Sequence, residues 1–246
     1  MTELDDLRAL VAQSCRIIGR LHLTREPNGH VSARIPGSDL ILIKARGAGE
    51  SALSFVETDD LMTADLDGKF VDGREGLASP AEIYIHTQMY RARHEVNSVI
   101  HIHPASVVAF TIAEKQLLPI IGAYNPVALR LVLEGLPVYP RSILINSVER
   151  GDDLAKTMGT ANACLMRGHG ITTAGRSVEE ATLTAIHLND LAELQYRAET
   201  LGGAQPIPEE DLDEFRRMNA RSSAGDTITR PPSSEWRYYE RLYGGD

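Results

Sequence analysis

The sequence has few cysteines, few aromatic residues and no excess of basic residues. Its two cysteines, Cys15 and Cys164, form neither a CxxC metal motif nor a disulfide framework. Both stand beside apolar residues, which predicts buried free thiols. Aspartate and glutamate outnumber lysine and arginine by 34 to 25, for a formal net charge of −9. Since nucleic acid and anionic membranes both require a positive surface, this balance argues against binding to either.

Long apolar runs are also absent. No uninterrupted apolar stretch approaches the ~20 residues of a membrane-spanning helix. The first residues, MTELDD, are acidic and lack the basic and apolar regions of a secretory signal. We therefore expect a cytoplasmic protein with no membrane partner. Hydrophobic residues make up 43% of the 246 residues, which suffices for a substantial core in one large domain or two small ones.

Helical and strand patterns alternate along the first 200 residues. Helical spacing of apolar residues predicts helices over 4–22, 80–93, 104–115, 151–160 and 177–200. Alternating or β-branched runs predict strands at 30–35, 40–44, within 55–75, at 97–104, near 136–140, near 161–167 and at 171–175. The order lacks a regular βαβ rhythm, which indicates an α/β fold with a mixed sheet covered by helices.

The last forty residues differ from the rest. Residues 203–235 are rich in Gly, Pro, Asp, Glu and Ser, and the segment WRYYERLY follows. We expect residues 1–205 to form the catalytic domain and 206–246 a poorly packed tail. Aromatic side chains are favoured at interfaces, so Trp236, Tyr238, Tyr239 and Tyr243 could cover a neighbouring subunit's pocket. Packing on their own subunit is the alternative.

Three of the eight histidines form a pattern suited to a metal. His101 and His103 are two apart on a predicted strand, so their side chains share one face, while Ile100 and Ile102 point into a core. His169 lies between two glycines, which permit a tight turn and close approach to another strand. A catalytic Zn²⁺ uses three protein ligands and an open position. Chance alternation and a simple turn remain the alternatives at this point.

The other polar signals have ordinary readings. Ser79, Pro80 and Glu82 would form the N-cap, N1 and N3 positions of a capping box. The remaining helical histidines, His22, His86, His94 and His187, are interpreted as surface or helix-face residues.

Four short motifs together resemble the class II aldolase/adducin family. They are Gly29-His30-Val31-Ser32, Ser79-Pro80-Ala81-Glu82, His101-Ile102-His103-Pro104 and Arg167-Gly168-His169-Gly170. The resemblance covers roughly residues 5–200. It implies an αβα fold around a nine-stranded mixed, mainly antiparallel sheet, and a tetramer with four-fold symmetry. It further implies that His101, His103 and His169 hold one divalent metal ion (Zn, Mn, Co or Fe). Glu82 would be a ligand or proton-transfer group.

The sequence departs from the family's sugar-phosphate aldolases at the anion-binding loops. Those enzymes usually carry Gly-Asn-x-Ser where this chain has His30, and Thr-Pro-Ser-Gly where it has Lys44-Ala45-Arg46-Gly47. Hydroxyl and amide donors suited to phosphate are replaced by cationic groups, and arginine pairs well with carboxylates. The candidate substrate-binding residues are Gly29, Ser32, Arg34, Lys44, Arg46 and Ser79. A solvated strand end is the alternative for Lys44 and Arg46.

This pattern resembles the family's decarboxylase branch, whose members act on hydroxylated aromatic or pyridine dicarboxylates. The resemblance implies a metal-dependent decarboxylase of a small anionic ortho-hydroxy (di)carboxylate, acting through a metal-stabilised enolate-type intermediate. Glu82 and His30 are the candidate catalytic residues for proton transfer. An aldolase or epimerase acting on a sugar phosphate is the first alternative. The second is an adducin-like interaction protein without catalysis, which the three histidines disfavour.

Overall fold

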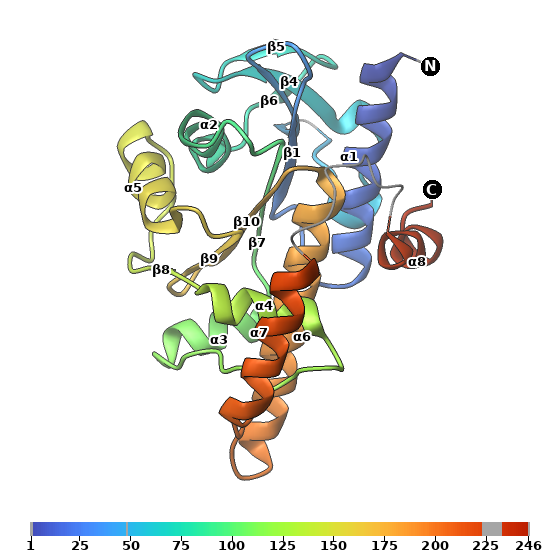
Figure 1. Ribbon diagram of the computed structural model, residues 1–246. Helices are drawn as coiled ribbons and strands as arrows, with labels where there is room; N and C mark the ends of the chain where they lie inside the picture. The colour runs from blue at the N-terminus through green and yellow to red at the C-terminus, as the bar shows by residue number, and fades with distance from the viewer. Residues whose placement is uncertain (1, 48, 223–232, 246) are drawn as a thin grey trace.

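The computed structural model describes residues 2–47, 49–222 and 233–245 of the chain (Figure 1). Its centre is an eight-stranded sheet. In spatial order, the strands are β5 (Phe70–Asp72), β4 (Leu61–Asp65), β2 (Leu40–Lys44), β1 (His30–Arg34), β7 (Ser98–Ile102), β10 (Gly170–Gly175), β9 (Ala163–Met166) and β8 (Val138–Tyr139). Every neighbouring pair in this sheet is antiparallel except β8 and β9. The mixed, mainly antiparallel sheet is therefore confirmed.

Helices cover both faces of the sheet. They are α1 (Glu3–Arg20), α2 (Ile83–Ala92), α3 (Ala105–Ile112), α4 (Pro126–Glu134), α5 (Val148–Met158), α6 (Val178–Thr200), α7 (Glu209–Ser222) and α8 (Ser234–Tyr243), with short 3₁₀ turns at Leu53–Phe55 and Thr58–Asp60. Figure 1 shows α2 and α5 on one side of the sheet and α1 and α6 on the other. No helix in the described part of the chain combines the length and hydropathy needed to cross a bilayer.

Period-two alternation along the strands sorts side chains between two cores. On β2, Ile41 and Ile43 pack in the core beneath α2 and α5, whereas Leu42 packs in the core beneath α1 and α6. On β7, Ile100 and Ile102 join the α1 and α6 core. The odd-numbered β7 residues therefore face α2 and α5, as the alternation predicts. This is the face on which the functional residues gather.

The strand count differs from the nine that the family resemblance implies. In the described residues, β3 (Arg46–Gly47) and β6 (Leu77–Ala78) pair with each other in a separate two-stranded ribbon. Each is only two residues long, and the ribbon stands apart from the eight-stranded sheet. Its role is to hold the loop after β2 against the loop before α2.

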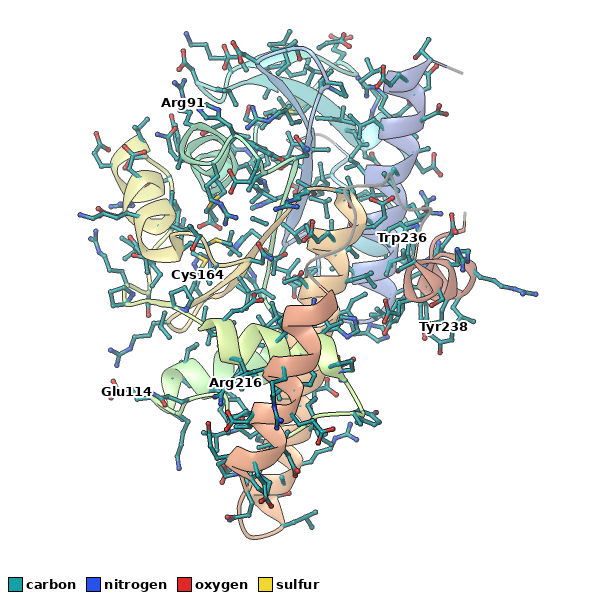
Figure 2. The ribbon with its side chains drawn as sticks, in the orientation of Figure 1. Arg91, Glu114, Cys164, Arg216, Trp236 and Tyr238 are labelled. Atoms are coloured by element: carbon teal, nitrogen blue, oxygen red, sulfur yellow. The ribbon has the colours of Figure 1, made fainter. Side chains whose placement is uncertain are left out.

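The C-terminal segment contains more structure than a poorly packed tail. Helix α7 spans residues that the composition left as irregular, and α8 begins after a Ser233 cap whose Oγ accepts from the Trp236 backbone N–H. Trp236 is 1% exposed and belongs to the α1 and α6 core, and it lies where α8 meets α1 (Figure 2). The Arg16 guanidinium donates to the Gly244 carbonyl at 2.8 Å. Within one chain, α8 therefore packs on its own subunit. Part of the predicted tail, residues 223–232, lies outside the described residues.

Candidate metal centre

Three histidines converge at one end of the α2 and α5 face. His101 lies on β7, His103 lies just beyond that strand, and His169 lies in the turn between β9 and β10. The Nε2 atoms of His101 and His103 are 3.0 Å apart. The His169 ring centroid lies 4.8 Å from that of His101 and 5.0 Å from that of His103. The structure thus brings the three predicted ligands together.

A glycine makes this convergence possible. Gly170 opens β10 beside the end of β7, and a Cβ atom there would lie 2.2 Å from the Ile102 carbonyl oxygen and 2.8 Å from the His103 ring. Only glycine lets the β9–β10 turn approach β7 this closely. The approach carries His169 to the other two histidines.

The hydrogen bond of His101 fixes which of its nitrogens is free. Its Nδ1 lies 2.9 Å from the Ile171 carbonyl oxygen, which can only accept, so Nδ1 carries the hydrogen. The lone pair is then on Nε2, directed at His103 and His169. Backbone carbonyls hold metal-binding histidines in this way in many metal sites. His101 is 0% exposed, so bulk water does not compete with the Ile171 carbonyl for the Nδ1 hydrogen.

Glu82 completes the cluster from the start of α2. Its Oε2 lies 3.4 Å from the Nε2 atoms of both His101 and His169. Its Oε1 accepts a 2.8 Å hydrogen bond from the Ile145 backbone N–H, which holds the carboxylate in place. The residue is 5% exposed. Glu82 therefore reaches the histidines from a different element, as a role at the metal requires.

The capping box predicted at this helix is wrong. Helix α2 begins at Ile83, so Glu82 itself occupies the N-cap position and makes no side-chain capping bond. The Ser79 hydroxyl donates to the Gly68 carbonyl at 2.6 Å instead. The helix starts later than the Ser-Pro pattern indicates because the Glu82 side chain is bound to Ile145 and the histidines.

The electrostatics of the cluster favour a cation. Burial alone would raise the pKa of Glu82, but hydrogen bonds and charge interactions with His101 and His169 outweigh it and lower that pKa below its ordinary value. Burial, together with the neighbouring histidines, lowers the pKa of His103 to about 3. At neutral pH the cluster therefore holds an ionised carboxylate and a neutral His103.

These residues fit a divalent metal ion. One ligand atom from each of Glu82, His101, His103 and His169 lies within 4.8 Å of the others. The bare Nε2 of His101 faces the His103 Nε2 at 3.0 Å, a contact between potential lone pairs that a shared cation would stabilise. Imidazole and carboxylate groups are ligands of Zn²⁺ and of related first-row metals. The donor set does not select among these metals.

A pocket of about 190 Å³ opens beside the cluster and carries cationic groups. It is lined by His30, Lys44, Arg46, Glu50, Glu82 and His103, with the loop residues Pro27, Asn28, Gly29, Ala45, Pro80, Ala81 and Leu144. The Lys44 Nζ is 2.7 Å from the Glu50 carboxylate and 3.0 Å from the Pro27 carbonyl oxygen. The buried, paired Lys44 does not match the solvated strand end weighed as its alternative.

Arg46 is exposed beside this pocket. Its Nε donates to the Ser79 carbonyl at 2.7 Å, and in the described part of the chain its terminal nitrogens have no hydrogen-bond partner. The planar guanidinium therefore retains a free pair of donors for an incoming anion. Ser79 contributes its backbone to this arrangement and does not itself line the pocket.

Comparisons with known proteins agree with this geometry. A family model described as the Class II Aldolase and Adducin N-terminal domain matches residues 9–196. The chain belongs to the class II aldolase and adducin family. The crystal structure of an aldolase II superfamily protein from Pseudomonas syringae shares the fold, with a TM-score of 0.81 at 23% identity, covering 98% of this chain and 95% of that one.

Two sequence relatives carry the name of an activity. A 3,4-dihydroxyphthalate decarboxylase from Arthrobacter keyseri is 37% identical over 212 residues, which covers 85% of this chain and 85% of the relative. A second 3,4-dihydroxyphthalate decarboxylase, from Rhodococcus jostii (strain RHA1), is 32% identical over 228 residues, covering 91% of this chain and 93% of the relative. This chain is therefore similar to both relatives over nearly its whole length.

Besides Ser79, two further predicted substrate-binding residues lie away from the pocket lining. Ser32 is fully buried under α2. The Arg34 guanidinium donates to the Tyr90 carbonyl at 2.9 Å, lies 4.9 Å from the centre of the Tyr90 ring, and borders a different surface pocket. Alternation along β1 puts Arg34 on the same face as His30, but four residues farther from the metal cluster. Its role in substrate binding gains no support from this placement.

One residue of the site was missed by the sequence reasoning. His86 was interpreted as a surface or helix-face residue, yet it is 0% exposed. Its Nε2 lies 3.2 Å from the His30 Nδ1, and its Nδ1 lies 2.7 Å from the Ser32 Oγ. The signal was present, because Glu82, His86 and Tyr90 recur every four residues and so share one face of α2. That face meets the polar face of β1.

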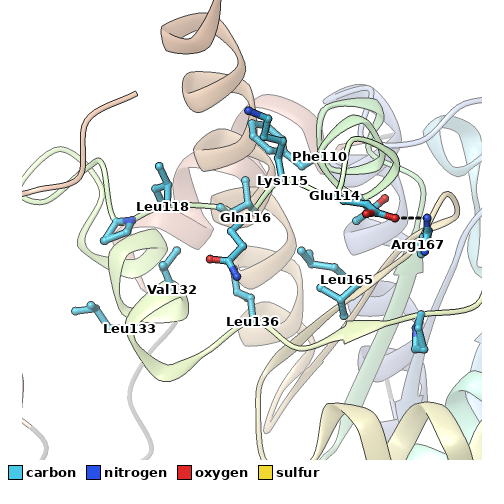
Figure 3. Close-up of a pocket in the computed structure, with 15 residues that line it drawn as sticks. Phe110, Glu114, Lys115, Gln116, Leu118, Val132, Leu133, Leu136, Leu165 and Arg167 are labelled. Atoms are coloured by element: carbon cyan, nitrogen blue, oxygen red, sulfur yellow. Dashed lines mark hydrogen bonds and ion pairs between the residues drawn. The ribbon is translucent and has the colours of Figure 1, made fainter. Parts of the chain in front are cut away.

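A larger pocket lies elsewhere on the molecule. Its volume is about 660 Å³, and the end of α3, α4 and the loop between them form much of its wall (Figure 3). Leucine and valine side chains dominate the lining, with the ion pair of Arg167 and Glu114 at its edge. None of the four residues of the metal cluster lines it, so chemistry is assigned to the smaller pocket.

Proposed function

We propose that this protein is a divalent-metal-dependent decarboxylase of an ortho-hydroxy aromatic or pyridine (di)carboxylate. The observation that carries the proposal is one pocket lined both by Glu82 and His103 of the histidine cluster and by the cationic groups Lys44 and Arg46. Similarity to the 3,4-dihydroxyphthalate decarboxylases supports the reaction class. The enzyme is accordingly a carbon–carbon lyase that releases CO2.

Each part of the pocket has a distinct task in this reaction. His101, His103 and His169, with Glu82, would hold the ion. When bound, a divalent ion stabilises the negative charge that develops on a substrate oxygen as the carboxylate leaves. The free donor pair of Arg46 binds and orients a carboxylate that is retained. His30 lines the same pocket and exchanges a proton with the substrate.

Lys44 sets the charge of the pocket. Its side chain is 1% exposed and paired with Glu50, whose side chain is 29% exposed. A buried ammonium favours an anion beside it, and the Glu50 carboxylate holds it until substrate arrives. Since Lys44 is paired with Glu50, Arg46 is the cation that remains for a substrate carboxylate. Its planar guanidinium and the scarcity of hydroxyl donors suit a dicarboxylate better than a phosphate, which is best held by backbone amides and small hydroxyls.

An aldolase or epimerase acting on a sugar phosphate is the second candidate, because the same metal cluster could serve it. The test is a substrate panel. Metal-loaded enzyme is incubated with 3,4-dihydroxyphthalate, with a hydroxypyridine dicarboxylate, and with fuculose, rhamnulose and ribulose phosphates. We expect CO2 from a dicarboxylate and no aldehyde from any sugar phosphate. Turnover of a sugar phosphate without CO2 from any dicarboxylate would replace the decarboxylase with the second candidate.

We also propose that the chain assembles as a homotetramer, as the family resemblance implies. Large apolar side chains near the site support an interface there, since Leu144 borders the small pocket and is 54% exposed, and Ile112 is 63% exposed. Exposed apolar side chains of this kind mark association surfaces when they are contiguous. Light scattering on the protein as it elutes from a size-exclusion column gives its mass and so the number of subunits, and a monomeric mass would reject the proposal.

A further inference from the structure

A chain of hydrogen bonds runs from the pocket into the space between β1 and α2. It begins at His30, which lines the pocket. The His30 Nδ1 is 3.2 Å from the His86 Nε2, and the His86 Nδ1 is 2.7 Å from the Ser32 Oγ. Ser32 also contacts the Tyr90 hydroxyl at 2.7 Å and the Val99 carbonyl oxygen at 3.2 Å. His86, Ser32 and Tyr90 are each 0% exposed.

The direction of every hydrogen bond in this series follows from the contact at its buried end, between the Ser32 hydroxyl and the Val99 carbonyl oxygen. A carbonyl oxygen can only accept, so the single hydrogen of the Ser32 hydroxyl points at Val99. Its two other neighbours must then donate to it, which makes the Tyr90 hydroxyl a donor and puts the hydrogen of His86 on Nδ1. The His86 Nε2 is left as an acceptor. The His30 Nδ1 must supply the hydrogen of the last bond.

The opposite direction is less favourable. If Ser32 donated to His86 instead, the Ser32 and Val99 oxygens would face each other at 3.2 Å without a hydrogen between them. Burial lowers the pKa of His86 to about 3. The ring therefore holds one hydrogen at neutral pH, and it cannot donate to both Ser32 and His30.

We propose that Ser32 and His86 are positioning residues that hold His30 as the Nδ1–H tautomer, with an unprotonated Nε2 available to the substrate. This rests on the proposed function for its consequence, though not for its geometry. With substrate bound, the His30 Nε2 takes the proton of the ortho-hydroxyl group, the electron pair of the O–H bond remains on the substrate oxygen, and His30 becomes an imidazolium. After CO2 has left, the imidazolium gives this proton to the ring carbon, where the new C–H bond replaces the broken C–C bond, and the product oxygen takes a proton from solvent.

This assignment gives His30 a different starting role from Glu82. The Glu82 carboxylate is ionised and bound within the metal cluster. His30 is outside that cluster, although its ring stacks on His101 with centroids 5.5 Å apart. The pocket therefore has a neutral base, His30, whose ring is oriented by the neutral imidazole of His86 on the side away from the pocket. Aspartate fills the corresponding place in a serine hydrolase triad.

Nitrogen NMR of the full chain, labelled with ¹⁵N-histidine and loaded with diamagnetic Zn²⁺, tests the assignment directly. Ring nitrogens with and without hydrogen resonate in separate regions, and a His30→Asn variant identifies the His30 signals by their loss. We expect a protonated Nδ1 and an unprotonated Nε2 for His30, and a protonated Nδ1 for His86. A protonated Nε2 on His30 in the resting enzyme would overturn the proposal. The measurement needs no substrate, so it stands or falls separately from the decarboxylase activity.

A pair of serine variants tests the consequence. Ser32→Ala removes the hydroxyl that fixes His86, and loss of an orienting partner typically lowers activity about 10-fold to 100-fold. We expect that fall in kcat, little change in KM, and mixed tautomers at His30. Ser14→Ala is the control, because the Ser14 Oγ is equally buried and makes a 2.7 Å contact to Thr182 on the opposite face of the sheet. An unchanged kcat and an unchanged His30 tautomer in folded Ser32→Ala would overturn the role of Ser32.

Discussion

Replacing Glu82 by glutamine tests the role of the negative charge in the cluster of Glu82 and three histidines. The two side chains have the same shape, and the glutamine Oε1 can still accept the hydrogen bond from the Ile145 N–H. What is lost is the negative charge 3.4 Å from the His101 and His169 nitrogens. Since His103 is neutral at pH 7, the carboxylate is the principal countercharge that the cluster offers to a divalent ion.

The expected magnitude follows from this geometry. Three imidazoles remain to hold the ion, so we expect Glu82→Gln to retain metal with a weakened affinity. Turnover should fall at least ~10²-fold, the usual scale for loss of a charged catalytic group, which corresponds to about 3 kcal/mol of transition-state stabilisation. Because Glu82 makes no capping bond to α2, any loss of stability in the metal-free variant should come from the lost charge interactions with His101 and His169 and not from a lost helix cap.

The assay combines metal content by atomic absorption, kcat for CO2 release, and urea unfolding of the metal-free protein. Glu95→Gln serves as the matched control, because Glu95 is an exposed carboxylate paired with Arg93 at 2.8 Å. A fully active Glu82→Gln enzyme with reduced stability would refute the reasoning and leave Glu82 with a structural role at the start of α2.

Three further predictions concern other parts of the molecule. Arg46→Ala should raise KM for a dicarboxylate by a larger factor than it lowers kcat, because the exposed guanidinium binds a carboxylate that does not react. A fall in kcat as large as the rise in KM would contradict this. Trp236→Ala should lower the free energy of unfolding by about 3–5 kcal/mol in urea titrations, the usual cost of emptying a buried aromatic site, and a smaller loss would show that α8 contributes little to the core. The pKa of His86 lies at about 3 against an ordinary 6.5, so the unfolded chain takes up a proton there that the folded chain does not. The free energy of unfolding should therefore fall as pH falls from 6.5 towards 3, by about 1.4 kcal/mol per pH unit from this residue. In the metal-free protein, His86→Phe should reduce the slope of unfolding free energy against pH by this amount, which corresponds to one proton.

Local patterns predicted much of the candidate metal centre. Alternation along β7 and the residue that follows it separates His101 and His103 from Ile100 and Ile102, and the structure confirms this separation. The glycines around His169 suggested it as the third ligand, whereas only the family resemblance placed Glu82 with the histidines. Both approaches depend on tertiary contacts, at Gly170 for His169 and at the loop of Ile145 for Glu82. Such contacts join residues about 60 or more apart in sequence, and no local pattern encodes them.

Other features depended on packing that the sequence does not display. Histidine on a helix is usually exposed, so the sequence does not indicate that His86 is buried. Its burial arises because α2 packs against β1, where His86 contacts His30 and Ser32. Arg34 shares a strand face with His30, yet the length of β1 carries it away from the pocket. The capping box failed because tertiary bonds to the Glu82 carboxylate outweighed a local helix signal worth about 1 kcal/mol.

The dependence of CO2 release on bound metal tests the account most directly. The protein is stripped with a chelator and reloaded in steps with a divalent ion. The rate of CO2 release from 3,4-dihydroxyphthalate and the metal content per chain are measured on the same samples, with His101→Ala as the variant that should be inactive. We predict a rate that rises in proportion to occupancy and levels off at one ion per chain. An equal rate from the metal-free protein, or from His101→Ala, would contradict the account.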